Sequence, residues 1–235
     1  ADSHNDLLQE IFTYRFAKGE GLAGHTLGNL ILMGLTDMKH GEVAAVDALS
    51  RLFRVKGHVI PVTLEKTTLV ATYDDGTSIQ SEHAIDEPTF DKQKRITRLE
   101  LNPQVKENPQ ASAAIRNADY IIVGPGDLFT TTLANIIVGD IAEAIQSSSG
   151  TFIFITNLMT KRGQTDAMKL RDTVNEITTY VGREPDCIIA HKGVIPKEIM
   201  NRPLQFNTPF SSMIISDEFK LNYDIFLQRV KDGLI

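Results

Sequence analysis

The stretch that decides the fold is ADYIIVGPGDLFTTTLANIIVGDIAEAI, residues 118–145. Its apolar run Tyr120–Val123 is short and ends at glycines, which predicts a buried strand, and the apolar spacing beyond Thr130 predicts helices. A strand that passes through a glycine turn into a helix is half of a βαβ unit. The stretch therefore predicts an α/β fold with a parallel sheet.

The same alternation of apolar strand and helix runs from Pro109 toward the C-terminus. The predicted strands are Tyr120–Val123, Thr151–Thr156, Cys187–Ala190 and Ser212–Ile215. The predicted helices are Gln110–Asn117, Thr130–Val138, Ile141–Gln146, Asp166–Val181 and Tyr223–Leu234. Near-continuous apolar strands of this kind are typical of a parallel sheet that is covered on both faces.

The first hundred residues show a less regular pattern. Helices are expected at 7–16, within 19–34 and at 42–53, followed by a strand over His58–Thr63. Thr67–Tyr73 and Ser78–Ile85 are expected to form a hairpin turned at 74–77, and a polar loop, 86–94, to lead into a strand over Ile96–Leu101. The expected fold is a mostly parallel sheet with an inserted β-hairpin, in a single domain spanning 1–235.

Composition excludes several classes of function. The 235 residues carry a net charge of −6, and no basic run exceeds the pair Lys94–Arg95, so a nucleic acid is not an expected partner. Cys187 is the only cysteine, so no internal disulfide can form and a reducing compartment fits; a buried, inert thiol is expected. No apolar run approaches the roughly 20 residues of a membrane helix, and no leader sequence is visible. A cytoplasmic protein with no membrane partner is expected.

The first candidate binding segment is the loop that follows Tyr120–Val123. Glycines let backbone N–H groups approach an anion, and the N-terminus of the next helix adds about half a positive charge. Gly124, Gly126, Asp127 and Leu128 are therefore predicted to hold a phosphate or pyrophosphate. The glycine spacing fits neither a Walker loop nor the dinucleotide fingerprint, and a tight strand-to-helix turn is the alternative interpretation.

The second candidate segment follows the predicted strand Thr151–Thr156. Asn157, Thr160 and Thr165 are polar residues near the carboxyl end of a buried strand, where open α/β sheets bind ligands. Thr165 is also a suitable N-cap for the helix expected from Asp166, and capping alone is the alternative role for it.

The third candidate segment is GLAGHTLGN, residues 21–29. His25 and Asn29 are four residues apart and would project together from one helix face toward a sugar or phosphate, while Gly24 and Gly28 would let another face pack closely. A histidine and an asparagine that only begin the helix are the alternative interpretation.

No metal-binding or nucleophile pattern occurs in the sequence. Motifs of the types H-x-x-x-H, H-E-x-x-H and G-x-S-x-G are absent, and the lone cysteine lacks a reactive setting. No cofactor held by protein ligands is therefore predicted, and Mg²⁺ is expected only in company with the nucleotide.

Five segments together resemble the bacterial gluconeogenesis factors of the 2-phospho-L-lactate transferase-like family. They are GEGLAGHTLGN (19–29), FRVKGHVIPVT (53–63), residues 118–145 quoted above, ITNLMTKRGQTD (155–166) and IIAHKGVIPKEI (188–199). The resemblance implies a three-layer, Rossmann-like fold with a site for a nucleotide diphosphate. The transferases move phospholactate from a guanosine diphosphate donor to a deazaflavin. The gluconeogenesis-factor branch implies UDP-sugar binding and a role in cell shape on gluconeogenic carbon sources.

The sequence also departs from that family pattern. The leading G-G-G-T-G loop and the Asp-Asp-Gly-Gly-Ser segment do not occur, so the domain is expected to lack its N-terminal glycine-rich βα unit. Lys161–Arg162 stands where the family pattern has Gln-Pro, and residues 217–235 lack an Arg-His-Asp-Thr type stretch.

Three hypotheses of function follow. The favoured one is a regulator that binds a nucleotide sugar or nucleotide diphosphate, with a homo-oligomer left open. The second is a transferase, for which the catalytic residues are unknown and only Asn157, His25 and Asp127 offer acceptor-side groups. A third, an α/β domain with an unrelated small ligand, stays open because a fold does not fix a function.

Overall fold

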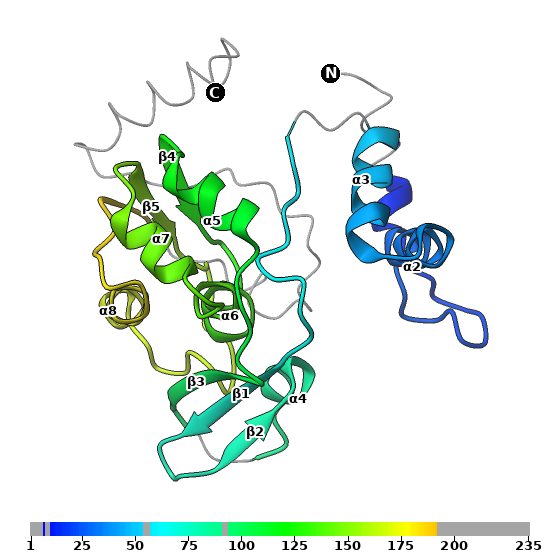
Figure 1. Ribbon diagram of the computed structural model, residues 1–235. Helices are drawn as coiled ribbons and strands as arrows, with labels where there is room; N and C mark the ends of the chain where they lie inside the picture. The colour runs from blue at the N-terminus through cyan, green and yellow to red at the C-terminus, as the bar shows by residue number, and fades with distance from the viewer. Residues whose placement is uncertain (1–6, 8–9, 54–56, 91–93, 192–235) are drawn as a thin grey trace. The chain divides into compact units, whose positions relative to one another are not determined.

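The computed structural model describes residues 7, 10–53, 57–90 and 94–191, and the chain divides into two compact units, 1–61 and 62–235 (Figure 1). The predicted strand Ser212–Ile215 and helix Tyr223–Leu234 lie outside the described residues. The expectation of a single domain stays a prediction.

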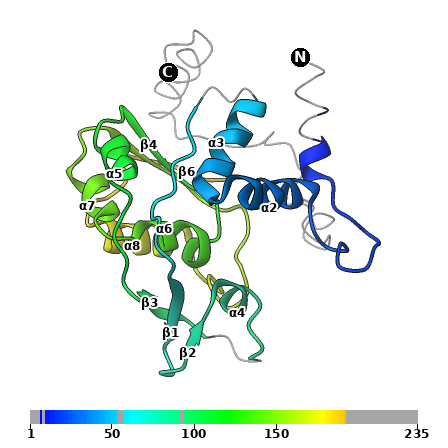
Figure 2. The same cartoon turned by 45° about the vertical axis from the view of Figure 1, so that its right-hand side comes forward.

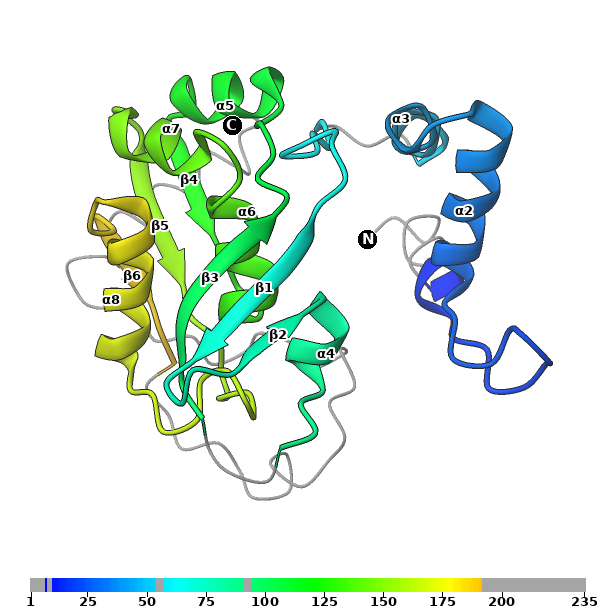
Figure 3. The same ribbon diagram turned by 60° about the horizontal axis from the view of Figure 1, so that its bottom comes forward.

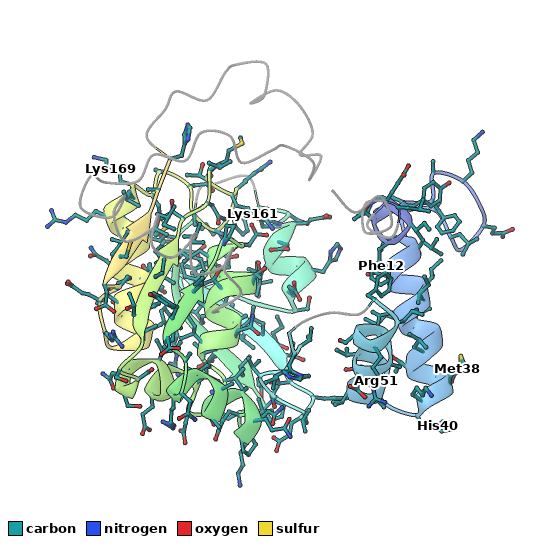
Figure 4. The ribbon with its side chains drawn as sticks, turned by 90° about the horizontal axis from the view of Figure 1, so that it is seen from above. Phe12, Met38, His40, Arg51, Lys161 and Lys169 are labelled. Atoms are coloured by element: carbon teal, nitrogen blue, oxygen red, sulfur yellow. The ribbon has the colours of Figure 1, made fainter. Side chains whose placement is uncertain are left out.

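The described residues of the first unit include α2 (Leu27–Lys39), α3 (Glu42–Leu52) and a helical turn over 10–13. The hydroxyl of Thr26 caps α2 by accepting from the backbone N of Asn29 at 3.2 Å, and His40, with φ 55°, ends it. The Phe12 ring lies 4.7 Å from that of Phe53 and packs so closely on Gly28 that a Cβ there would lie 2.5 Å from it (Figure 4). Gly28 therefore allows the close packing that the sequence predicted.

The second unit begins with an antiparallel sheet of β1 (Thr68–Tyr73), β2 (Ser78–Gln80) and β3 (Ile96–Asn102), in the order β2-β1-β3 (Figure 2). The predicted hairpin is confirmed, but its second arm is shorter than Ser78–Ile85 because Ser81 caps a helix, α4 (Glu82–Asp86). The described part of the sheet ends at β3, where the backbone N of Leu99 donates to the phenol oxygen of Tyr180 at 3.0 Å.

The strand predicted over His58–Thr63 is wrong. Residues 57–63 form no strand, and their polar groups bond to a loop instead. The carbonyl of Val62 accepts from the backbone N of Asn108 at 2.7 Å, and the Thr63 hydroxyl donates to the carbonyl of Lys106 at 2.7 Å. Among the described residues this apolar run has no neighbouring strand to pair with, which accounts for its irregular backbone.

The parallel sheet consists of β4 (Tyr120–Val123), β5 (Thr151–Ile155) and β6 (Cys187–Ile189), in that order (Figure 3). Three predicted strands are thus confirmed to within one residue. In the described part of the chain the expected mostly parallel sheet is two separate sheets, one parallel and one antiparallel. Ile121, Phe152 and Phe154 are buried and share one face, which anchors this sheet in the core.

Two helices beside the parallel sheet match their predictions. They are α5 (Pro109–Arg116), which Asn108 caps with Pro109 at its first position, and α7 (Ile141–Ser147), which packs against α5.

The helix predicted from Asp166 begins later, as α8 (Leu170–Val181). Ala167 adopts a left-handed φ of 58°, and the Asp166 carboxylate accepts from the backbone N of Gly163 at 2.6 Å. A turn therefore occupies the start of the predicted helix. The N-cap is Lys169, so the prediction that Thr165 caps this helix is wrong.

The helix predicted over Thr130–Val138 is divided into a π-helix, η1 (Leu128–Leu133), and one short turn, α6 (Ala134–Ile136). The backbone N of Thr132 donates to the carbonyl of Asp127 at 2.9 Å, an i to i−5 bond that widens the first turn.

The amino end of the parallel sheet is held by a group of bonds that we call the Arg183 cluster. The Arg183 guanidinium donates to the carbonyls of Ile145, Ser148 and Gly150 and pairs with Asp186. Asp186 in turn accepts from the backbone N of Phe152 at 2.7 Å. The cluster therefore ties α7, β5 and β6 together.

No helix in the described ranges is long and apolar enough to cross a membrane, and the pair Leu128–Ile136 and Ile141–Ser147, which together pass by length and composition, is bent by 75°. The Cys187 thiol is partly buried, and this burial, with a smaller contribution from Asp186, raises its pKa to about 11. A thiol with this pKa is a weak nucleophile at neutral pH, as the sequence predicted.

Candidate functional site

A pocket of about 260 Å³, here called the carboxyl-end pocket, opens where β4, β5 and β6 end. Its walls are the loop after β4, the loop after β5 and the start of α8. The lining residues are Gly126, Leu128, Phe154, Thr156, Asn157, Leu158, Met159, Thr160, Thr165, Met168, Lys169, Leu170, Thr173, Ala190 and His191. This is the edge at which open α/β sheets bind ligands.

Five of the nine predicted site residues line this pocket: Gly126, Leu128, Asn157, Thr160 and Thr165. The two predicted segments after β4 and β5 are therefore brought together, as their positions at the ends of neighbouring parallel strands required.

The two glycines of the loop after β4 have different roles. Gly124 has φ +87° and does not line the pocket, and a Cβ on it would overlap the carbonyl oxygen of Ile155. Gly124 therefore allows β4 and β5 to approach each other closely. This structural role agrees with the alternative interpretation, in which the glycine serves a tight strand-to-helix turn. Gly126 does line the pocket, and its backbone N–H donates to Asn157 Oδ1 at 3.1 Å.

Asn157 therefore connects the two loops. Its Oδ1 accepts from Gly126, and no protein atom within the described ranges bonds to its Nδ2. An exposed amide with one fixed oxygen and one open donor can recognise a phosphate or sugar oxygen.

Asp127 does not line the pocket but forms an ion pair immediately beside it. The ammonium of Lys161, a residue labelled in Figure 4, bonds to the carboxylate of Asp127 and, at 2.8 Å, to Asp86 at the end of α4. Partial burial alone would lower the pKa of Lys161, but the bonds to Asp127 and Asp86 outweigh it and raise this pKa. Burial likewise opposes ionisation of Asp86, yet the bonds from Lys161 and Thr130 lower its pKa. Lys161 and Asp86 are therefore both charged at neutral pH.

Gln164 and Thr165 hold the loop after β5 in place. The Gln164 side chain is only 1% exposed, and its Oε1 accepts from the backbone N of Phe129 at 3.3 Å. The Thr165 hydroxyl accepts from the backbone N of Lys161 at 2.7 Å. Each pocket loop is thus fixed by side-chain bonds rather than by regular secondary structure.

The pocket combines polar and apolar groups. The polar lining residues are Thr156, Thr160, Thr173, Lys169 and His191, and the apolar wall is formed by Leu158, Met159, Met168 and Leu170. A ligand with a charged part and a flat or apolar part suits this lining.

His25 and Asn29 belong to the first unit, and their position relative to the pocket is not described. The prediction that they project together from one helix face is wrong, because His25 precedes the N-cap Thr26 and only Asn29 lies in α2. Gly24, with φ +89°, also lies in the turn before the helix. Both His25 and Asn29 are exposed, in agreement with residues that begin a helix.

Sequence reasoning missed several site residues. His191 follows the predicted strand Cys187–Ala190, so it could have been found by the same argument as Asn157. Lys169 could have been found once the helix start was placed correctly. Asp86 and Gln164 carry no local signal, since their bonds join residues 78 positions apart. Within the described ranges no group of three or more His, Cys, Asp or Glu side chains could hold a metal ion.

The model of the family described as "2-phospho-L-lactate transferase CofD" matches residues 1–222. The chain belongs to this family. The resemblance found in the sequence is thereby confirmed. Among CofD relatives, a Deinococcus radiodurans protein named "Putative gluconeogenesis factor" is 36% identical, with 85% of this chain and 43% of that protein covered. The Listeria innocua "Gluconeogenesis factor" is 35% identical, with 81% of this chain and 59% of that protein covered.

A solved CofD-family neighbour has a similar fold. The crystal structure of a UPF0052 family member from Bacillus halodurans is 33% identical, has a TM-score of 0.74, and covers 92% of this chain and 68% of its own. The chain spans about half the length of the curated relatives it matches.

Proposed function

We propose that the protein containing this chain is a gluconeogenesis factor that binds a nucleotide sugar, of the UDP-sugar type, in the carboxyl-end pocket. The observation that carries the proposal is the meeting of Gly126, Asn157, Thr160 and Thr165 in one pocket at the carboxyl ends of parallel strands. The names of the relatives supply the metabolic role, and the pocket supplies a place for the ligand.

Different residues of the pocket lining suit different parts of such a ligand. Lys169 and the first turn of α8 attract a diphosphate, since an ammonium and a helix N-terminus both favour negative charge. The Asn157 amide and the Thr160 hydroxyl suit sugar oxygens, and the methionines suit the flat base. Mg²⁺ enters this proposal only as the counter-ion of the diphosphate.

The rest of the proposal concerns the whole protein. It acts in the cytoplasm as a regulator of carbon supply and cell shape, within a single three-layer, Rossmann-like domain. The parallel and antiparallel sheets of the chain and the 0.74 TM-score to the Bacillus halodurans structure support the fold part. A homo-oligomer is compatible with it.

Calorimetry of the full-length protein with UDP-glucose, UDP and inorganic phosphate tests the ligand. We expect Asn157→Ala to weaken UDP-glucose binding by more than about tenfold, or roughly 1.4 kcal/mol. Asn175→Ala, an equal change on the exposed side of α8 and outside the pocket lining, is the control and should leave affinity unchanged. Equal affinity of both variants and the unchanged protein would remove the pocket from the site.

The second candidate function is a transferase that moves a phospholactyl-type group from a nucleotide diphosphate to an acceptor. Two observations favour it: the family model is that of 2-phospho-L-lactate transferase, and the His191 imidazole lines the pocket, where it could move a proton.

A turnover assay separates the two functions. The full-length protein with Mg²⁺ is incubated with UDP-glucose, and separately with guanosine diphosphate-linked phospholactate and a deazaflavin, and nucleotide release is followed by chromatography. For a binder, Asn157→Ala lowers affinity and no turnover is seen. Multiple turnovers that disappear in Asn157→Ala while binding persists would make the protein an enzyme.

A further inference from the structure

Asp86 does not line the carboxyl-end pocket, but both pocket loops are bonded to it. Its Oδ1 accepts from Thr130 Oγ1 at 2.6 Å, from Gln164 Nε2 at 2.7 Å and from Lys161 Nζ at 2.8 Å. Thr130 follows the loop after β4, whereas Lys161 and Gln164 belong to the loop after β5. One carboxylate oxygen at the end of α4 therefore joins the two loops.

The carboxylate of Asp86 also sets the orientation of the buried Gln164 amide. An ionised carboxylate only accepts hydrogen bonds, so the Gln164 group that faces it must be the NH₂. The Gln164 oxygen is then directed to the backbone N of Phe129, in the first turn of η1. An asparagine at position 86 could present either its oxygen or its NH₂ and would not fix this orientation.

Lys161 carries the influence of Asp86 to the pocket wall by two routes. Its ammonium bonds to Asp127, which lies between the pocket residues Gly126 and Leu128. Its backbone N donates to the hydroxyl of Thr165, which is itself a pocket residue. A shift of Lys161 would therefore move both walls.

We propose that Asp86 is a positioning residue of the carboxyl-end pocket, which holds the loops after β4 and β5 in their ligand-binding arrangement through Lys161, Gln164 and Thr130. The inference rests on the proposed function for the nature of the ligand, a nucleotide diphosphate-type molecule. It extends the site to α4, which lies beside the antiparallel sheet and outside the pocket lining.

The first arm of the test measures UDP-glucose affinity of the full-length protein by calorimetry. Asp86→Asn should weaken binding by about tenfold, and Asp86→Glu, which keeps an acceptor-only carboxylate, should restore affinity to within about threefold. If Asp86→Glu keeps the affinity that Asp86→Asn loses, the negative charge is responsible, because a change in packing alone would not produce this difference. Asp75→Asn is the matched control, because Asp75 forms a 2.7 Å ion pair with Lys94 in the hairpin turn, outside the pocket lining.

The second arm needs no ligand and measures hydrogen exchange by mass spectrometry. In Asp86→Asn, residues 126–133 and 157–165 should exchange faster than in the unchanged protein, and in Asp75→Asn they should not. Thr130→Val, which removes one donor to Asp86 without a change in shape, should give a smaller increase in the same two segments. This variant keeps the test valid if Asp86→Asn does not fold.

The two experiments distinguish a failure of the proposed function from a failure of the positioning role of Asp86. If the unchanged protein binds no UDP-glucose, the proposed function fails, and the exchange arm alone decides the role of Asp86. Unchanged exchange of both segments in the folded Asp86 and Thr130 variants would overturn the positioning role. A tenfold loss of affinity in both Asp86→Asn and Asp86→Glu would also overturn the positioning role.

Discussion

Each end of the parallel sheet carries a cationic side chain that is paired with a carboxylate, yet the two ends differ in the polar groups that remain beside it. At the amino end, Arg183 bonds to three backbone carbonyls and to Asp186, which in turn holds a strand N–H. At the carboxyl end, the Lys161 ammonium bonds to the carboxylates of Asp127 and Asp86, and the loops beside it leave an amide and several hydroxyls in a pocket.

This difference shows how a structural ion pair can be distinguished from one that supports a site. The Arg183 cluster provides hydrogen-bond donors for the backbone carbonyls of the turn before β5. Its removal should therefore lower the free energy of unfolding and leave ligand binding unchanged. The bonds around Lys161 fix loops whose remaining polar groups face a cavity. A change there should appear in ligand binding as well as in stability.

The largest expected effect concerns one glycine at each end of the sheet. A Cβ on Gly124 would overlap the carbonyl oxygen of Ile155, and a Cβ on Gly150 would overlap that of Ala118. Alanine at either position should cost about 3 kcal/mol of unfolding free energy, and more at Gly124, whose φ is +87°. Urea denaturation measures this. Gly34→Ala, in α2 with open space around it, is the control and should be neutral or slightly stabilising.

The next largest expected effect concerns the amino end of the parallel sheet alone. Arg183→Met should lower the unfolding free energy by about 2–3 kcal/mol, because three carbonyls and Asp186 lose a charged donor. Its folded form should bind UDP-glucose as well as the unchanged protein does. A fall in affinity as large as that of Asn157→Ala would show that the two ends are not independent, and the comparison would fail.

A smaller effect is expected from the cation at the start of α8. Lys169→Met should weaken UDP-glucose binding by about fivefold, or roughly 1 kcal/mol, and the loss should shrink as salt is raised, since Lys169 is exposed. Arg171→Met removes an exposed cation two residues further along, outside the pocket lining, and should have little effect. Equal losses from both variants would indicate a general charge effect and no direct contact.

The smallest effect is on the pH dependence of stability. Because the pKa of Asp86 is lowered by folding, its carboxylate stabilises the protein at pH values above its unfolded pKa of about 3.9. That contribution disappears as the pH falls through the folded pKa. The difference in urea midpoint between the unchanged protein and Asp86→Asn should therefore be constant from pH 8 to about 5 and shrink below about 4. A difference that persists at low pH would mean that Asp86 acts without its charge.

How much could be predicted from the sequence depends on where the deciding bonds lie. The strands at 120, 151 and 187 were placed well because each is a short apolar run bounded by local turn signals. The start of α8 was misplaced because Ala167 adopts a conformation that is unusual for alanine. The widened turn of η1 was missed because Gln164, 35 positions away, bonds to its Phe129.

The same reasoning applies to the candidate site. Gly126, Asn157 and Thr160 could be found because the carboxyl end of a strand is visible in the sequence. Gly124 was assigned to the ligand although the close carbonyl of Ile155 explains it, since the distance between two strands cannot be read from either alone. Lys161 was noted only as a departure from a family pattern, and its two carboxylate partners appear only in the folded chain.

The bond from Leu99 to Tyr180 has a consequence for association between molecules. An edge strand presents unpaired N–H and C=O groups, which are a template for pairing with the edge of another chain. At β3 one of these N–H groups is occupied by the Tyr180 phenol. In the described part of the chain, α8 thus covers part of the edge strand β3 and makes it less available for pairing with another chain. The first residues of the same helix line the pocket.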